Sequence, residues 1–154
     1  MKFLVINGPN INMLRYTGPQ LTGEMDYIAL VNYIHAGCEQ MGIEVEFFQS
    51  NHEGDLIDEI QNAPGRADGI LLNPAGYAHS SVAILDALRT TDMPAVEVML
   101  DAPSEKEPFR RTDVISFGCQ GHFIGEGPVG YLHAAAYLAQ LLRSDGTPRT
   151  RLTM

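Results

Sequence analysis

The amino-acid sequence predicts an α/β fold in which helices cover both faces of an open, parallel, five-stranded sheet. Short apolar runs alternate with amphipathic helical patterns along the 154 residues, as in sheets whose strands are joined by helices. The first run, residues 3–6, is apolar throughout, which is typical of a strand buried on both faces. Polar motifs rich in Asn, Gly, Ser and Pro follow several of the runs, at the points where the strands would end.

Five apolar runs are the predicted strands: residues 3–6, 43–48, 69–72, 95–99 and 121–124. The first predicted helix follows Asp26, whose side chain can accept hydrogen bonds from the first turn. This helix runs to about Met41, and Gly42 is suited to end it.

Three further helices are predicted between and after the later strands. The second helix begins at Asn51 or His52, and the third begins at His79 or Ser80. The last helix is predicted over residues 129–142. Pro128 marks its start, because proline is favoured in the first turn of a helix. This order of elements predicts a flavodoxin-like sheet. We expect one domain over residues 1–143 and a disordered tail over residues 144–154.

Composition places the chain among ordinary globular proteins, with 45% hydrophobic and 19% charged residues. Cys38 and Cys119 lie far apart and have no zinc-like spacing, so we expect a reduced, cytoplasmic setting. No apolar run approaches the roughly 20 residues that span a bilayer. A net charge of −9 argues against a nucleic-acid partner, which needs clustered basic residues.

Polar motifs gather near the predicted carboxyl ends of the strands, where open parallel sheets bind ligands. They are Asn7-Gly8-Pro9-Asn10, Gln49-Ser50-Asn51-His52-Glu53-Gly54, Asn73-Pro74-Ala75-Gly76-Tyr77-Ala78-His79-Ser80-Ser81, Glu97-Val98 and Phe109-Arg110-Arg111. The first motif is also compatible with a simple turn. It lacks the Gly-x-Gly-x-x-Gly spacing of dinucleotide sites.

Together these motifs resemble those of the type II 3-dehydroquinate dehydratases over about the whole chain. The resemblance implies a lyase of the shikimate pathway of aromatic amino acid biosynthesis. Such an enzyme converts 3-dehydroquinate to 3-dehydroshikimate through an enolate, with no cofactor and no metal. The resemblance also implies a small anionic cyclic hydroxy/oxo acid as ligand and trimers that assemble into a dodecamer.

The resemblance further implies roles for individual side chains. Asn10 would stabilise the enolate, for which a neutral amide donor is suited. The implied substrate-binding or positioning residues are Asn73, His79, Ser80, Ser81, Arg110 and Asp86, the last in a neighbouring subunit's site. Arginine's planar fork suits vicinal oxygens or a carboxylate. On local grounds, the two serines are equally explained as helix caps, and Asp86 as an exposed acid.

Three positions depart from the family pattern. The family's catalytic tyrosine, lid arginine and catalytic histidine correspond to Thr22, Thr17 and Met99, none of which offers the same chemistry. Arg15 and Tyr16 lie close by in the loop predicted over residues 14–24. They are candidates to supply a cation and a phenol in place of the missing groups, or are simply exposed residues of that loop.

Glu97 is the remaining member of a Glu-x-His pair that the family carries at the end of the fourth strand. Without its histidine, a carboxyl group at the sheet end can have a raised pKa and act as an acid or base. Alternatively, Glu97 forms an ion pair with Arg110 or another neighbour. The loop after this strand also departs from the family, because Asp101-Ala102 replaces a Ser-Asn pair and adds negative charge.

Three functions remain open from the sequence. The first is a dehydratase of the family type, with activity reduced or lost. The second is a divergent enzyme that acts on a related hydroxy or oxo acid and uses Glu97 and His79 for proton transfer. The third is a binder of small acids without catalytic activity, or a structural subunit.

Overall fold

The structure is a computed structural model that describes residues 1–17 and 25–145. Within these residues, five parallel strands form one sheet in the order β2-β1-β3-β4-β5. The strands are β1 (Lys2–Asn7), β2 (Glu44–Gln49), β3 (Gly69–Asn73), β4 (Ala95–Met99) and β5 (Gly121–Ile124). The predicted parallel sheet is therefore confirmed, and each strand begins and ends within one residue of its predicted range.

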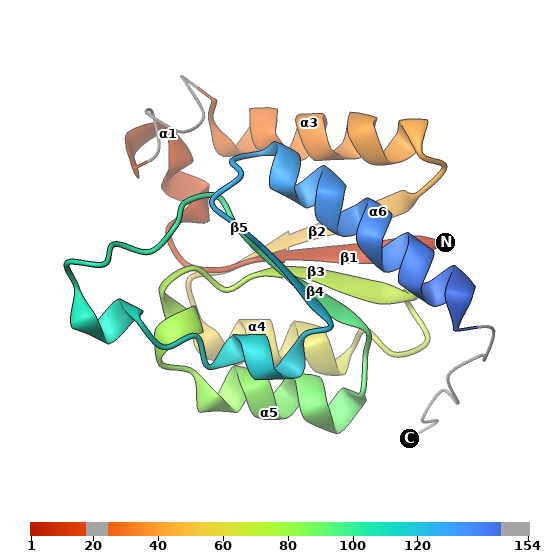
Figure 1. Ribbon diagram of the computed structural model, residues 1–154. Helices are drawn as coiled ribbons and strands as arrows, with labels where there is room; N and C mark the ends of the chain where they lie inside the picture. Colours follow the sequence, from red (N-terminus) through yellow and green to blue (C-terminus); the bar gives the residue numbers. More distant parts are fainter. Residues whose placement is uncertain (18–24, 146–154) are drawn as a thin grey trace.

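Two layers of helices enclose the sheet, as Figure 1 shows. Helices α3 (Tyr27–Gln40) and α6 (Val129–Ser144) cover one face, and α4 (Glu53–Gln61) and α5 (Val82–Thr91) cover the other. Successive residues of β1 point to opposite faces, so Phe3 and Val5 join one buried cluster and Leu4 and Ile6 the other. The continuous apolar run of β1 thus follows from burial on both sides.

Side-chain caps begin two of the helices. Asp26 accepts a hydrogen bond from the backbone N–H of Ala29 at 2.8 Å and begins α3 as predicted. Gly42 follows this helix with a positive φ of 72°, a conformation that glycine adopts without strain. Ser81 accepts a hydrogen bond from Ile84 N–H at 3.0 Å and begins α5.

The helices differ from the prediction in four places, the first being the start of α4, at Glu53 rather than at Asn51 or His52. Helix α5 begins at Val82 rather than at His79 or Ser80, because the preceding residues form the short 3-10 helix η2 (Ala75–His79). Residues 14–17, predicted as loop, form the short helix α1 (Leu14–Thr17). Helix α6 continues to Ser144, into the predicted tail, and residues 146–154 of that tail lie outside the described residues.

The carboxyl ends of the strands lie together at one edge of the sheet (Figure 1). The chain leaves β1 toward β2 on one side and later adds β3 on the other side. Such a reversal marks the place where open α/β sheets bind ligands. After β4, the chain extends away from the sheet through η3 (Pro108–Arg110) and returns through η4 (Ile115–Gly118), which packs against α5.

Candidate functional site

Asn51 joins the loops that follow β1, β2 and β3. Its side-chain oxygen accepts hydrogen bonds from the backbone N–H of Asn10 at 3.0 Å and from Gln49 Nε2 at 3.2 Å. Its backbone oxygen accepts a hydrogen bond from the Tyr77 hydroxyl at 3.2 Å. Asn51 therefore fixes three loops of the ligand-binding edge relative to one another, a role that the sequence analysis did not assign to it.

Asn10 has the left-handed conformation, with φ 70°, at the start of the short 3-10 helix η1 (Ile11–Met13). Asparagine tolerates this region better than most residues. Its backbone is held at both ends, because its N–H donates to Asn51 and its carbonyl accepts from Met13 N–H at 2.9 Å. The side chain is exposed, and no side-chain cap bond occupies it. An amide donor is thus presented at the edge of the sheet.

The loops after β1 and β3 pack closely against each other. Gly8 N–H donates to the carbonyl oxygen of Asn73 at 2.8 Å. A Cβ atom at Gly8 would lie 2.7 Å from the carbonyl oxygen of Pro74, too close for any other residue without a backbone shift. The glycine of the first motif is therefore required by this contact.

Asn73 is buried, with 2% of its surface exposed, and its amide group is fully engaged. Its Nδ2 donates to the Tyr131 hydroxyl at 2.8 Å, and its Oδ1 accepts from Ala75 N–H at 3.1 Å. Tyr131 in turn donates to Asn7 Oδ1 at 2.6 Å. This buried network connects α6 to the ends of β1 and β3, so Asn73 supports the site from within the protein core. Its substrate-binding role stays a prediction.

The two serines before α5 differ in their surroundings. Ser81 is 1% exposed, caps α5 and donates a hydrogen bond to Glu53 Oε2 at 2.6 Å, so its hydroxyl is engaged within the fold. Ser80 is exposed at the end of η2 and does not cap the helix. The cap interpretation therefore holds for Ser81, and Ser80 presents its hydroxyl to solvent.

His79 ends η2 with one ring nitrogen engaged and the other without a partner. Its Nδ1 lies 2.9 Å from the carbonyl oxygen of Thr112. A carbonyl only accepts hydrogen bonds, so Nδ1 carries the proton, and in the neutral ring Nε2 keeps its lone pair. Nε2 is buried and has no hydrogen-bond partner. A buried polar atom without a partner is unusual in a folded protein, so Nε2 is available to a bound ligand or to water.

Glu97 is fully buried at the end of β4, and neither of its carboxylate oxygens has a hydrogen-bond donor. Burial, followed by the nearby carboxyl group of Asp113, raises the pKa of Glu97 to about 9. Glu97 is therefore protonated and neutral at pH 7. It does not pair with Arg110, which forms an ion pair with Glu107 at 2.6 Å instead. The predicted pairing of Glu97 with Arg110 is therefore wrong, whereas a neighbour does lie beside Glu97, because His122 Nδ1 is 3.7 Å from Glu97 Oε1.

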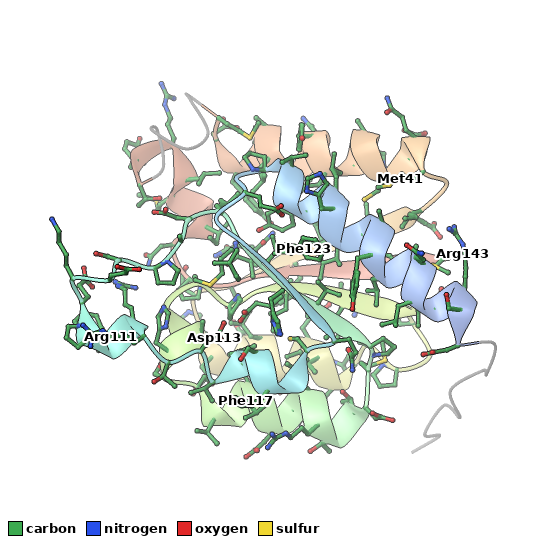
Figure 2. All side chains as sticks on the ribbon, in the orientation of Figure 1. Met41, Arg111, Asp113, Phe117, Phe123 and Arg143 are labelled. Carbon is green, nitrogen blue, oxygen red and sulfur yellow. The ribbon has the colours of Figure 1, made fainter. Side chains whose placement is uncertain are left out.

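His79 and Glu97 are connected through one stretch of backbone. The carbonyl of Thr112 accepts the His79 hydrogen bond, and the next residue, Asp113, contacts Glu97. Val114 N–H donates to the carbonyl of Ala78 at 2.8 Å, which fixes this stretch against η2. In Figure 2, Asp113 lies beneath the sheet, whereas Arg111 lies farther out on the loop. Within the described residues, the buried side-chain atoms without a partner belong to His79 and Glu97.

The remaining predicted site residues lie at the surface. Tyr16 is 76% exposed and Arg15 is exposed on α1, and both keep only their predicted roles. Thr17, at the lid-arginine position, donates its hydroxyl to the carbonyl of Met13 at 3.3 Å. Thr22, at the position of the catalytic tyrosine, lies outside the described residues. Asp86 is exposed on α5.

Arg110 is half-exposed, and its guanidinium group makes two local contacts. Its Nε donates to Glu107 Oε2, and its Cζ atom lies 5.5 Å from the centre of the Phe109 ring. The predicted binding of substrate by this arginine therefore competes with a carboxylate from its own loop.

The sheet order, the reversal between β1 and β3, and the polar groups at the carboxyl edge define a flavodoxin-like protein with a small-molecule site. Residues 1–139 match the family model described as "Dehydroquinase class II". The chain is 42% identical over 141 residues to the 3-dehydroquinate dehydratase of Campylobacter hominis, with 92% of this chain and 91% of that protein covered.

Solved structures agree with this match. A type II dehydroquinase from Butyrivibrio crossotus is 43% identical, with a TM-score of 0.85 over 90% of this chain and 97% of that one. A type II dehydroquinase from Propionibacterium acnes is 29% identical, with a TM-score of 0.80 over 90% of this chain and 98% of that one. The chain belongs to the class II dehydroquinase family, whose named members here are lyases. The family, the fold and the lyase class predicted from the sequence are confirmed.

Proposed function

We propose that this protein is a hydro-lyase of the 3-dehydroquinate dehydratase type that uses His79 and Glu97 for proton transfer. The observation that carries the proposal is the pair of buried groups without hydrogen-bond partners, His79 Nε2 and the Glu97 carboxyl, at the edge where the sheet binds ligands. The fold match over the whole described domain supports the same class of reaction. A small, anionic, cyclic hydroxy/oxo acid is the proposed ligand.

The proposed reaction removes water in two steps. His79 Nε2 takes the proton next to the substrate's carbonyl, and the amide of Asn10 donates a hydrogen bond to the enolate oxygen that results. The carbon–oxygen bond to the hydroxyl group then breaks, and the neutral Glu97 carboxyl gives its proton to the departing hydroxyl, which leaves as water. The imidazolium of His79 afterwards loses its proton to solvent, and the Glu97 carboxylate regains one.

Glu97 fits this acid role better than Met99 does. A thioether has no proton to donate, whereas a carboxyl group with a pKa of about 9 holds its proton at neutral pH. An acid that keeps its proton at the working pH and gives it up in the transition state is the kind that general acid catalysis needs. The site therefore keeps a proton donor two residues before the position where the family has one.

The proposal extends to assembly and setting. Asp86 is exposed on α5, as it must be to reach the site of a neighbouring subunit, so we propose a homo-oligomer built from trimers, up to the dodecamer. We also propose a cytoplasmic protein consisting of one domain over residues 1–143. Within the described part of the chain, no helix is long and apolar enough to cross a membrane.

The deciding experiment is an ultraviolet assay of the conjugated enone that forms when purified protein meets 3-dehydroquinate. Turnover that falls about 100- to 10,000-fold in both His79→Gln and Glu97→Gln would support the proposal. Turnover that both variants leave intact would refute the assigned roles. Absence of turnover in the unmodified protein, together with thermal stabilisation by 3-dehydroshikimate, would favour a second function.

That second function is ligand binding without catalysis, and one observation favours it. Met99 replaces the family's proton donor, and the Glu97 carboxyl that remains is completely covered in the structure without ligand. If no movement exposes Glu97, the binding groups at the sheet edge hold a ligand that is never dehydrated. Absence of both turnover and binding would instead direct the search to a related acid, because Glu107 adds negative charge beside Arg110 and Asp101 adds it earlier in the same loop.

A further inference from the structure

We propose that Glu97, Asp113 and His122 form one proton-holding unit, in which the two carboxyl groups share a proton and His122 exchanges protons between them and solvent. The exchange role of His122 during turnover rests on the proposed function, whereas the shared proton does not. Asp113 and His122 were not among the residues that the sequence suggested for the site.

The shared proton follows from the hydrogen-bonding capacity of the two carboxyl groups. Glu97 is completely buried, and its oxygens find no N–H or O–H donor. Its close neighbour is the Asp113 carboxyl. Two ionised carboxylates are acceptors only and repel each other, so they form a hydrogen bond only when one of them holds a proton. A proton held between Glu97 and Asp113 supplies the donor that the buried Glu97 oxygens lack and removes the repulsion.

Glu97 is the more deeply buried of the two carboxyl groups, and burial raises its pKa. Asp113 is half-buried, and its Oδ1 accepts a hydrogen bond from the backbone N–H of Ser116 at 3.1 Å. Glu97 has no such donor and is more deeply buried, so the neutral form is favoured there.

His122 connects this pair to solvent. It is the neighbour of Glu97 in the parallel register of β4 and β5, and its Nδ1 lies 3.7 Å from Glu97 Oε1. The His122 side chain is 41% exposed, whereas the Glu97 side chain is 0% exposed. An imidazole ring has nitrogens that can accept a proton and donate one. A ring that touches both the buried acid and the solvent can therefore return the proton that Glu97 gives up in each catalytic cycle.

The other groups around Glu97 do not replace these partners. On the β3 side its register neighbour is Leu72, which has no polar side-chain group. Cys119, between η4 and β5, faces both acids, and burial together with their charges raises its pKa, so the thiol stays protonated. No Lys or Arg of the described residues is among the groups that shift Glu97. Nor do the described His, Cys, Asp and Glu residues form a metal-binding group.

The test is a titration of the glutamate and aspartate carboxyl carbons by ¹³C NMR, without substrate, with Glu97 and Asp113 assigned from Glu97→Gln and Asp113→Asn. We expect the Glu97 carbon to titrate near pH 9 and to move to lower pH in Asp113→Asn, where the neighbouring negative charge is gone. Asparagine keeps an oxygen that can accept from Ser116 N–H, so this variant retains the local fold. A Glu97 carbon that titrates in the ordinary range of carboxyl groups would overturn the shared proton.

His122 is tested against a matched control. His133 also lies beside a glutamate, Glu126, with Nδ1 3.4 Å from Oε1, but on α6 and outside this cluster. At the titration midpoint, the Glu97 line should broaden in His122→Gln, because exchange with solvent slows, and should be unchanged in His133→Gln. Equal line widths in both variants would overturn the role of His122.

A kinetic test uses a second variant. Where turnover exists, added imidazole should restore the turnover lost in His122→Ala. Absence of turnover with a Glu97 titration near pH 9 would refute only the proposed reaction.

Discussion

His79 donates its Nδ1 proton to the carbonyl oxygen of Thr112 at 2.9 Å, which fixes both the orientation and the tautomer of the ring. The bond spans two segments that are 33 residues apart in sequence, η2 and the stretch between η3 and η4. Because the same stretch carries Asp113 beside Glu97, the base and the acid of the proposed reaction are positioned by consecutive residues.

His79→Gln should abolish turnover with little effect on folding. Glutamine can still donate a hydrogen bond toward Thr112, but it has no basic nitrogen in the place of Nε2. We expect kcat to fall about 100- to 10,000-fold and the free energy of unfolding to change by about 1 kcal/mol or less. Steady-state kinetics and thermal unfolding measure the two effects. His52→Gln is the control, since His52 is exposed at the start of α4. Equal kcat values for the two variants would exclude His79 as the base.

The buried carboxyl of Glu97 should make stability depend on pH at neutral and alkaline values. Its pKa is about 9 in the folded protein and 4.5 in its ordinary state, so the folded protein binds the proton more tightly. The stabilising contribution is complete below pH 4.5 and is lost as the pH rises through 9. Glutamine is neutral at every pH and resembles the protonated acid in shape, so Glu97→Gln should lack this dependence.

The measurement is Tm from pH 5 to 9 for the unmodified protein and for Glu97→Gln. The two proteins should unfold at similar temperatures near pH 5, and the variant should become relatively more stable toward pH 9. Glu46→Gln is a control of opposite sign. Glu46 is half-exposed, and hydrogen bonds from Arg66 and Lys2 lower its pKa, so its stabilising contribution is complete above pH 4.5 and Glu46→Gln should lower Tm by the same amount from pH 5 to 9. A parallel pair of Tm curves for Glu97→Gln and the unmodified protein would contradict a neutral buried glutamic acid.

Tyr131→Phe should destabilise the protein and weaken the buried hydrogen-bond network that holds the ends of β1 and β3 together. The Tyr131 hydroxyl donates to Asn7 Oδ1 and accepts from Asn73 Nδ2, and its side chain is completely buried. Removal of the hydroxyl leaves two buried amide groups short of a partner, which costs about 1–3 kcal/mol. Denaturant unfolding measures the loss.

Tyr137→Phe is the matched control for this variant. Tyr137 lies on the same helix and donates one hydrogen bond, to the Gln120 carbonyl at 3.0 Å, but its side chain is 39% exposed. Water can replace that bond, so we expect a loss below about 1 kcal/mol. If both variants lose the same stability, the buried network does not hold the ends of β1 and β3 together.

The fold was predictable from local patterns, whereas the partners within the site were not. The apolar runs predict all five strands, because buried strands leave a short uninterrupted apolar signal, and Asp26 marks the start of α3. The predicted start of α5, at His79 or Ser80, is too early, because Ser80 and Ser81 are both suited to cap a helix and the local sequence does not distinguish them. Only the structure shows that η2 occupies the preceding residues and that Ser81 accepts the hydrogen bond.

The partners of Glu97 follow from tertiary contacts that have no local signature. Asp113 lies 16 positions further along the chain, in a stretch with no periodic pattern, and His122 meets Glu97 only through the register of β4 and β5. Tyr131 sits on a largely apolar helix, where its ring alone explains its burial. The resemblance to the family's Glu-x-His motif therefore identifies Glu97 as a candidate, but it does not show which groups set its protonation.

Glu107→Gln should strengthen the binding of anionic ligands. Glu107 occupies the Nε edge of Arg110 at 2.6 Å, and Arg110 is the predicted arginine for substrate oxygens. Both side chains are about 40% exposed, so their ion pair is weak, with a typical strength of about 0.2–1 kcal/mol. A ligand that must displace Glu107 loses that amount, and the variant should bind about 1.5- to 5-fold more tightly.

Calorimetric titration with 3-dehydroshikimate measures this change, and Glu105→Gln supplies the control. Glu105 is exposed in the same loop, so its substitution removes the same charge without releasing Arg110 from its ion pair. A gain in affinity that is larger for Glu107→Gln shows that the ion pair itself opposes binding. Equal gains in both variants show instead that the general negative charge of the loop repels the ligand, because such repulsion does not depend on the ion pair. No gain in either variant would place the ligand away from Arg110.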